Sequence, residues 1–198
     1  MPRVTLRVPF EEKEEAKKLG ARWDRTQQTW YVPDGIDSSR FKNWLPVPEP
    51  PNIRAPRWFL ATSARECWRC GGRSCVFAIV LPPEHEALMV EDDPADDYWE
   101  RGWSSTLLSY VVDVAEPVAA RLRRVAPRYR VDYSQTTHSF YWMNHCEHCD
   151  AKLGDFETME EPGTFYGCDL TFEVGSPRAV DLCEIAEPFT GSCGGHTE

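Results

Sequence analysis

The sequence predicts an α+β protein in two parts, a small β-α-β-β-α module and a larger strand-rich α+β domain. Residues 1–46 place a charged helix pattern between alternating strand patterns, and four strand-like runs surround one helix pattern after residue 57. Between them, PVPEPP at 46–51 is semi-rigid, because proline fixes φ and removes a hydrogen-bond donor. We therefore expect domains at 1–46 and 57–198, joined by a Pro-rich linker at 47–56.

The first module is expected to begin with a strand and a helix. Val4, Leu6 and Val8 alternate with polar residues, which is the pattern of a strand with one buried face. In EEKEEAKKLG, residues 11–20, acids fill the first turn and lysines the last, as the helix dipole favours. Gly20 stands just after the helix, where glycine is the common terminator.

Aromatic side chains dominate the rest of this module. Trp23 and Trp30 flank the polar stretch DRTQQ, which predicts a hairpin with aromatic pairing across it. Asp37 or Ser38 then begins a short helix with Phe41 on its inward face. The buried surface is expected from five large side chains: Phe10, Trp23, Trp30, Tyr31 and Trp44.

The larger domain is expected to contain several strands and one helix. The helix pattern AEPVAARLRRVA has Pro117 near its start and Val118, Leu122 and Val125 on one stripe. The strand-like runs cover 75–81, 105–112, 129–133 and 164–174.

Negative charge is concentrated in the larger domain. The chain carries a formal charge of −10 at pH 7, whereas residues 1–50 hold nine Lys/Arg and eight Asp/Glu. An acidic body repels a DNA duplex, which argues against a dedicated DNA-binding protein. Between Glu84 and Glu100 there are eight acids and no Lys or Arg. This favours a solvated acidic loop, and a cation site or a basic protein partner bound through residues 84–100 is the alternative.

The sequence favours a cytoplasmic location without membrane contact. Residues 1–20 are charged and lack the apolar run of a signal peptide, and no stretch of about eighteen apolar residues occurs. In the cytoplasm the eight cysteines would stay reduced. The sequence does not predict an oligomeric state.

Two Cys-x-x-Cys motifs, ECWRCGG at 66–72 and HCEHCDA at 145–151, predict a metal site. This spacing lets one tight turn direct two thiolates at one cation, and two such turns complete a tetrahedral Cys₄ zinc site. Gly71, and Asp150 in the second motif, would take the left-handed conformation that such a turn requires. The sequence thus predicts one structural zinc in a zinc-ribbon-like site, with the ligands Cys67, Cys70, Cys146 and Cys149.

Other interpretations of these cysteines remain open. Compact ribbons join their two turns within about 15–20 residues, whereas 75 residues separate the motifs here, so two unrelated pairs of thiols are the alternative. His145 or His148 would have to replace a cysteine in a catalytic zinc site, because four thiolates close the metal shell to water. His145-Cys146-Glu147 has the H-x-E form of zinc deaminases, but there the C-x-x-C lies in a separate element.

The remaining cysteines and histidines give weaker patterns. Cys75 lies in an apolar strand pattern and is expected in the core. His85 and His138 are isolated and more typical of surface or hydrogen-bonding positions than of catalysis. A second metal site is an alternative with irregular spacing, and its ligands would be Cys168, Cys183, Cys193 and His196.

Residues 3–46 closely resemble a small uncharacterised bacterial domain. Its signature is VP-x-x-EK-x-x-AK-x-LGA-x-WD, followed by WY-x-P and F-x-x-WLP. The resemblance implies a place beside plasmid primases and exonucleases, and so an auxiliary role near nucleic acid. The candidates for phosphate contact are Lys13, Lys17, Arg22 and Arg25, with a merely solvated face as the alternative.

The second part of the chain resembles a bacterial zinc-ribbon-containing family of unassigned function, and two motifs carry the resemblance. The motifs are CW-x-C, here CWRC at 67–70, and YW-x-N-x-C-x-x-C-x-x-x-x-GD, here YWMNHCEHCDAKLGD at 141–155. The resemblance implies that both turns share one zinc, and it implies no activity.

Together these patterns predict a zinc-binding, non-enzymatic accessory protein that engages nucleic acid or a nucleic-acid-processing complex. The alternative is an acidic protein-interaction module, an adaptor or inhibitor with a purely structural zinc. An enzyme that uses the zinc region or a separate cleft is the third alternative.

Overall fold

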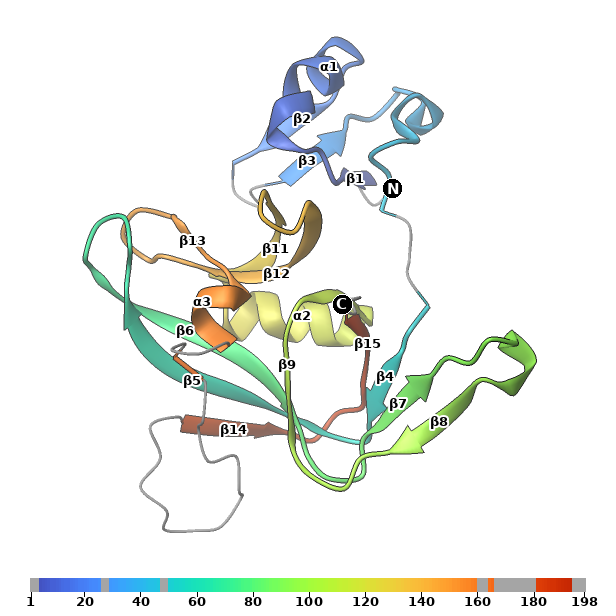
Figure 1. The fold of residues 1–198 in the computed structure, drawn as a ribbon. Helices are drawn as coiled ribbons and strands as arrows, with labels where there is room; N and C mark the ends of the chain where they lie inside the picture. Colours follow the sequence, from blue (N-terminus) through green and yellow to red (C-terminus); the bar gives the residue numbers. More distant parts are fainter. Residues whose placement is uncertain (1–3, 26–28, 47–49, 160–163, 166–180, 194–198) are drawn as a thin grey trace. The chain divides into compact units, whose positions relative to one another are not determined.

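The fold was determined as a computed structural model that describes residues 4–25, 29–46, 50–159, 164–165 and 181–193. It confirms the predicted α+β class, with many strands and few helices. The chain divides into two compact units, one formed by 1–48 with 132–140 and the other by 49–131 with 141–198 (Figure 1). Each unit is described by itself below.

The first unit contains the predicted sequence of strands and helix around a three-stranded antiparallel sheet with the order β1-β3-β2. Its hydrophobic core consists of Leu6, Val8, Ala16, Ala21, Val32, Phe41 and Trp44. The elements are β1 (Val4–Leu6), the 3₁₀ turn η1 (Phe10–Glu12), α1 (Lys13–Lys18), β2 (Arg22–Asp24), β3 (Thr29–Val32) and η2 (Ser38–Phe41).

The ends of the short helices agree with the sequence. Gly20 follows α1 with φ +105°, a conformation that glycine adopts without strain. Asp37 begins η2, where its carboxylate accepts a hydrogen bond from the Ser39 amide at 2.9 Å. The last element is a 3₁₀ turn rather than an α-helix, yet it still buries Phe41.

Aromatic burial differs from the prediction at two positions. Trp23 and Trp30 form the expected cross-strand pair, with ring centroids 5.5 Å apart. Trp23 is nevertheless 46% exposed, because β2 is an edge strand. Phe10 is 66% exposed, and the Lys13 ammonium lies 3.4 Å from its ring centroid. The prediction that both side chains are buried is therefore wrong, whereas Trp44 is buried as expected.

The rest of the described chain is built on three sheets, and strands β11 and β12 of one of them extend into residues 132–140, which belong to the first unit. The strand orders of the three sheets are β10-β15-β4-β7-β8, β14-β5-β6-β9 and β11-β12-β13. The strands are β4 (Ile53–Ala55), β5 (Trp58–Glu66), β6 (Arg73–Leu81), β7 (Glu86–Met89), β8 (Tyr98–Arg101), β9 (Thr106–Leu108), β10 (Val111–Val114), β11 (Tyr129–Ser134), β12 (Ser139–His145), β13 (Lys152–Leu153), β14 (Asp181–Ile185) and β15 (Phe189–Cys193). The helical elements are η3 (Pro94–Asp96), α2 (Glu116–Val125) and α3 (Asp155–Met159).

The long antiparallel hairpin β5–β6 positions the cysteine site. Its register runs from Phe59 opposite Val80 to Glu66 opposite Arg73, so that the first Cys-x-x-Cys turn forms its tip. One apolar cluster lies beneath that tip and includes both Cys67 and Cys146. Its other buried members are Phe59, Ala61, Val76, Ala78, Val80, Ala151, Leu153, Met159 and Phe165.

Helix α2 forms as predicted, with Pro117 in its first turn. Val118 and Leu122 are buried, but Val125 is exposed. The helix ends at Val125, and the following Ala126 leaves the helical conformation and enters the core instead. The predicted stripe is therefore correct only for its first two members.

Two other predicted strands differ from the structure. The run 105–112 is divided into β9 and β10, which belong to different sheets, and Tyr110 between them has φ +50°. Residues 164–165 of the run 164–174 lie in a turn, and the rest of that run is outside the described residues. Over the described part of the chain, no helix is long and apolar enough to cross a membrane.

The acidic segment 84–100 forms a β-hairpin, and the largely exposed residues 90–97 that join its two strands are a solvated acidic loop, as predicted for this segment. Its strands β7 and β8 pair from Glu86 opposite Arg101 to Met89 opposite Tyr98. Near its base, Glu84 forms an ion pair with Arg101 at 2.7 Å and Glu86 with Arg54 at 2.6 Å. His85 is buried there, with Nδ1 2.9 Å from the Pro82 carbonyl. The lone histidine thus has a structural hydrogen bond.

Candidate metal centre

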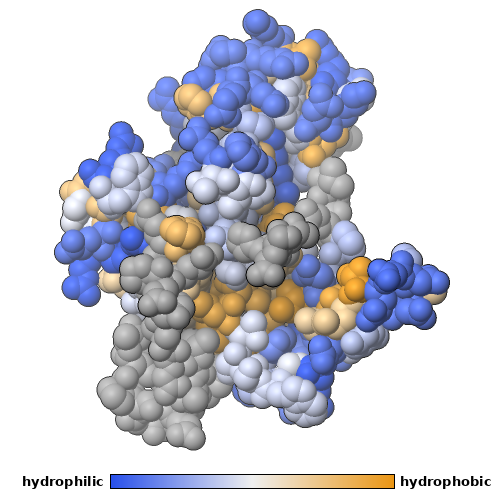
Figure 2. Space-filling view, in the orientation of Figure 1, coloured by the Kyte–Doolittle hydropathy of each residue, from blue (hydrophilic) through white to orange (hydrophobic). Residues whose placement is uncertain are grey.

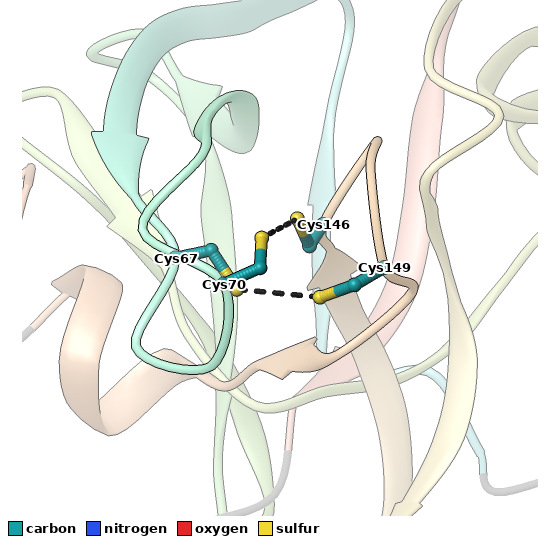
Figure 3. Close-up of side chains that lie close together, drawn as sticks. All are labelled: Cys67, Cys70, Cys146 and Cys149. Carbon is teal, nitrogen blue, oxygen red and sulfur yellow. Dashed lines mark hydrogen bonds between the residues drawn. The ribbon is translucent and has the colours of Figure 1, made fainter.

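Two turns bring the four predicted cysteines together. Cys67 and Cys70 lie in the turn between β5 and β6, and Cys146 and Cys149 lie in the turn between β12 and β13. All four sulfur atoms are within 4.8 Å of one another. Figure 3 shows the side chains pointing inward from the two turns, with Cys67 Sγ 3.7 Å from Cys149 Sγ and Cys70 Sγ 3.6 Å from Cys146 Sγ. The two motifs are therefore far apart in sequence but adjacent in the fold.

The two turns have the same backbone geometry, and we name them knuckle 67–72 and knuckle 146–151. In each, the amide two residues after the first cysteine donates to that cysteine's sulfur, at 3.4 Å in both. The amide four residues after it donates to the first cysteine's carbonyl, at 2.8 and 3.0 Å. The first cysteine's own amide donates to the carbonyl five residues later, at 3.0 and 2.9 Å.

The predicted left-handed residues occupy equivalent positions in the two knuckles. Gly71 has φ +69° and Asp150 has φ +59°. Asp150 also forms ion pairs with Arg128 and Arg130, each at 2.9 Å. A carboxylate at this position therefore combines a tolerated backbone conformation with charge pairing.

Side chains from each knuckle fasten the other. Trp68 Nε1 donates to the Lys152 carbonyl at 2.8 Å, and His148 Nε2 lies 3.0 Å from the Arg73 carbonyl. The buried Ser74 hydroxyl donates to Cys146 Sγ at 3.2 Å and accepts from the Glu147 amide at 3.1 Å. These bonds connect the two knuckles directly to each other.

The sulfur spacing suits a tetrahedral metal. A zinc–sulfur bond of about 2.3 Å places the sulfurs of a regular tetrahedron about 3.8 Å apart, close to the 3.6 and 3.7 Å found here. The four cysteines could therefore hold one metal ion. Since all four corners would be protein sulfurs, no position would remain for a reactive water.

Electrostatics also favour a cation at the centre. The Ser74 hydroxyl, with neighbouring backbone amides, lowers the pKa of Cys146 to about 5 although burial opposes it. For Cys149 the Ala151 amide acts to lower the pKa, but burial and the three neighbouring thiols outweigh it and raise the pKa to about 12. Protons are thus divided unequally among the sulfurs, and a divalent cation replacing them would stabilise several thiolates at once.

The histidines beside the second motif are not part of the sulfur cluster. Among the described residues, the group that could hold a metal consists of the four cysteines. His145 is buried, with Nδ1 3.1 Å from the Met143 carbonyl and 3.2 Å from the Arg128 carbonyl. His148 faces the Arg73 carbonyl instead. Both rings therefore lie within hydrogen-bond distance of backbone carbonyls near the site.

The other cysteines lie elsewhere. Cys75 is half-buried rather than in the core, because Ser74 and Val76 take the inward positions of β6. Cys183 is exposed on β14, and Cys193 is half-buried on β15. The two further ligands of the alternative second site, Cys168 and His196, lie outside the described residues.

The four candidate phosphate contacts lie on the first unit. Lys13 and Lys17 are on α1, Arg22 is on β2, and Arg25 follows that strand. Lys17, Arg22 and Arg25 are exposed, and Lys13 is half-buried.

Lys17 connects this basic group to the aromatic pair of the same unit. Its ammonium lies 2.7 Å from Glu14 Oε1 and 5.8 Å from the Trp30 ring centroid. The pKa of Glu14 is lowered, chiefly by the hydrogen bond from Lys17. Trp30 packs in turn against the exposed Trp23. Basic and aromatic groups therefore meet on one exposed face.

Sequence reasoning missed the bonds that fasten the knuckles. Ser74 could have been found, because it stands at an inward position of a strand directly after a Cys-x-x-Cys motif. Trp68 could be recognised from the sequence only as part of the CW-x-C motif. Its acceptor, the Lys152 carbonyl, could not be recognised, since a backbone acceptor is independent of residue type.

The fold and the site together define a strand-rich α+β protein with a four-cysteine cluster that could bind a metal. Residues 3–46 match the family described as "Domain of unknown function (DUF5710)", which supports the resemblance predicted for this segment. No solved structure matches the chain.

The N-terminal part is also similar to two proteins from Escherichia coli, each named DNA primase TraC. The chain is 60% identical to one and 57% identical to the other, over 42 residues in each case. These 42 residues are 21% of this chain but only 3% and 4% of the two relatives. The similarity thus concerns a short segment of much longer proteins.

Proposed function

We propose that this protein is a zinc-binding, non-enzymatic accessory protein of the cytoplasm that engages nucleic acid or a nucleic-acid-processing complex. The zinc part rests on one observation: two knuckles of equal backbone geometry direct four sulfurs within 4.8 Å of one another. Four thiolates in a tetrahedron suit zinc, and a closed sulfur shell suits a structural role. The resemblance of the motifs at 67–70 and 141–155 to those of a zinc-ribbon family is compatible with this proposal.

Elemental analysis of the purified full chain tests the metal. We expect one zinc per chain, and a sharp loss of zinc in Cys146→Ser. The matched control is Cys183→Ser, the same chemical change at an exposed cysteine outside the cluster. Iron in place of zinc, or full zinc retention in Cys146→Ser, would contradict the proposed centre.

The nucleic-acid part rests on the similarity of the N-terminal segment to DNA primase TraC. The surface of that segment supports it, because Lys17 lies beside Trp30, which packs against the exposed Trp23. Phosphates bind cations, and bases stack on aromatic rings. The Lys17–Glu14 pair does not preclude a phosphate contact, since exposed ion pairs contribute little stability and exchange partners readily.

Salt-titrated binding of single- and double-stranded DNA tests this surface. In the full chain, Lys17→Glu/Arg22→Glu should weaken binding strongly at about 50 mM salt and reduce the salt dependence. The control is Arg40→Glu/Lys42→Glu, the same change of charge at two exposed residues of the same unit. Equal losses in the two double variants would show a general charge effect and remove Lys17 and Arg22 as a site.

A basic protein partner is a second candidate, favoured by the β7–β8 hairpin. The outer part of this hairpin gathers five carboxylates next to exposed apolar side chains, Val90 and Tyr98 among them. In Figure 2 the arm at the right of the molecule is blue at its tip with orange atoms beside it. Acidic groups around a small apolar surface suit a basic protein. Loss of a co-purifying protein in Asp92→Lys/Asp93→Lys would support this candidate.

A further inference from the structure

An exposed tryptophan stands on the knuckle 67–72. The Trp68 side chain is 64% exposed, although large aromatic rings are usually buried. Its indole nitrogen donates to the Lys152 carbonyl at 2.8 Å, so that the ring is held to the other knuckle in one orientation. A ring fixed in this way loses little further freedom when a ligand stacks on it.

The surroundings of Trp68 are basic in an otherwise acidic unit. Arg69 follows Trp68 on the same knuckle, while Arg73 and Lys152 come directly after the two knuckles, and all three are exposed. The knuckles and their immediate partners hold six of the thirteen Lys/Arg after residue 50, but only three of the twenty-four Asp/Glu. The six cations are Arg65, Arg69, Arg73, Arg128, Arg130 and Lys152, and the three acids are Glu66, Glu147 and Asp150.

This local positive charge remains when the proposed metal is included. Six cations and three carboxylates give a formal balance of +3, and a zinc ion with four thiolates adds two negative charges. We name the exposed residues Trp68, Arg69, Arg73 and Lys152 the knuckle face. Their surroundings thus keep a formal charge of about +1, while the rest of the unit is strongly negative. A focused patch of this kind attracts an anionic ligand against the general repulsion of the molecule.

We propose that the knuckle face binds single-stranded nucleic acid, with a base stacked on Trp68 and phosphates contacted by Arg69, Arg73 and Lys152. An indole offers a flat face that any base can stack on, while basic side chains follow the backbone. A duplex keeps its bases stacked inside, so this face prefers single strands. The inference rests on the proposed nucleic-acid function, but it assigns a second surface on the other unit.

An acidic protein is the competing partner, because Trp and Arg are also common at protein interfaces. Such an interface surrounds its central tryptophan with apolar contacts that exclude water. The immediate neighbours of Trp68 on its knuckle are instead Cys67 and Arg69, and its hydrogen bond leads to the exposed Lys152. Basic side chains beside the ring fit a strand of nucleic acid better.

The test measures binding of a fluorescent 20-nucleotide oligo-dT to the full chain over a range of salt concentrations. Trp68→Ala should weaken binding about tenfold, as removal of one stacking partner does. The matched control is Trp103→Ala, because Trp103 is 88% exposed and lies on a different loop of the same unit. Trp68→Phe keeps a ring without the indole hydrogen bond and should retain more binding than Trp68→Ala.

Charge is tested with a second pair of variants. Arg69→Glu/Arg73→Glu should weaken binding and reduce its salt dependence, whereas Arg123→Glu/Arg124→Glu on α2 should have little effect. Zinc content measured on every variant identifies any that lose the fold of the site. Equal binding by Trp68→Ala and Trp103→Ala overturns the inference, and so does tighter, Trp68-dependent binding of poly-glutamate than of oligo-dT.

The two proposed surfaces can fail separately. If Lys17→Glu/Arg22→Glu leaves oligo-dT binding intact and Trp68→Ala reduces it, the knuckle face stands and the surface of the first unit is wrong. If only Lys17→Glu/Arg22→Glu reduces binding, the proposed function stands and the knuckle face is wrong. If the intact protein binds no nucleic acid at about 50 mM salt, both are wrong.

Discussion

Gly71 and Gly72 are neighbours in sequence but are required for different reasons. Gly71 has φ +69° and open space where a Cβ would lie, whereas a Cβ on Gly72 would lie 2.6 Å from His148 Cδ2. We expect Gly71→Asn to cost under about 1 kcal/mol, since Asn tolerates the left-handed conformation. Gly72→Ala should cost about 1–3 kcal/mol, because it displaces the ring that reaches the Arg73 carbonyl. Denaturant unfolding of both variants checks the order, and an equal cost would contradict it.

Asp150 shows how one residue can combine a backbone and an electrostatic role. Asp150→Asn keeps a residue that tolerates φ +59° but removes the charge paired with Arg128 and Arg130. We expect a loss of about 1 kcal/mol or less, because these side chains are partly exposed. Asp150→Ala should lose more, since it adds left-handed strain. Unfolding at low and high salt separates the charge contribution from the backbone contribution. High salt should reduce the loss of stability in Asp150→Asn, but it should not change the additional loss in Asp150→Ala.

At the scale of residues, local conformation could be predicted from the sequence but distant partners could not. Positive φ at Gly71 and Asp150 follows from what these residue types tolerate. Asn144 and Asp155 are close to the second knuckle in sequence, but their partners are distant. Asn144 bonds to Phe77 on β6, and Asp155 accepts from the Tyr110 amide at 2.6 Å. Both partners are brought near by the fold and are invisible in a local pattern.

At the scale of elements, Asn144 joins two sheets. Its side chain lies on β12. The side-chain Oδ1 accepts from the Phe77 backbone amide at 2.8 Å, and the side-chain Nδ2 donates to the Phe77 carbonyl at 2.9 Å. Asn144→Ala would leave both backbone groups without these bonds, at a cost of about 1–3 kcal/mol. Asn144→Asp should cost more, because a buried carboxylate would face the Phe77 carbonyl.

The half-buried Asn52 provides a matched comparison for this prediction. It makes the same pair of bonds with the backbone of Cys193, at 2.9 and 3.0 Å. Because water can reach this site more easily, Asn52→Ala should be less costly than Asn144→Ala. Thermal unfolding of the three variants tests the order, and a greater loss in Asn52→Ala would refute it.

The strands show where a periodic pattern is sufficient and where it is not. The run 75–81 and helix α2 were found because their apolar residues are continuous or regularly spaced. The division of 105–112 was missed, since Tyr110 adopts a positive φ that its residue type gives no reason to expect. Strands β7 and β8 were missed because the many acids of this segment obscured the strand pattern; its ion pairs, Glu84 with Arg101 and Glu86 with Arg54, form only in the fold. Cross-strand charges are recognisable only once the register is known.

At the scale of the whole molecule, the two units have separate cores. The core of the first unit is formed by residues 6–44, and the cysteine cluster belongs to an apolar cluster of residues 59–165 in the second. The pairing of two knuckles 75 residues apart could be predicted, because two Cys-x-x-Cys turns together supply the four ligands of a tetrahedral metal. The strands that bring them together could not, since pairing over such distances leaves no local periodicity.

Metal removal should therefore unfold one unit and leave the other. Structural zinc contributes about 10–16 kcal/mol in small zinc domains, comparable with the whole stability of a domain. In the full chain, a strong chelator or Cys146→Ser should remove the protection of amides in the second unit against hydrogen exchange. Amides of the first unit, such as those of Ala16 and Val32, should stay protected, because their core contains no cysteine. Cys183→Ser should behave as wild type. Loss of protection in both units would show that they fold as one, and unchanged protection would show that the cysteine cluster needs no metal.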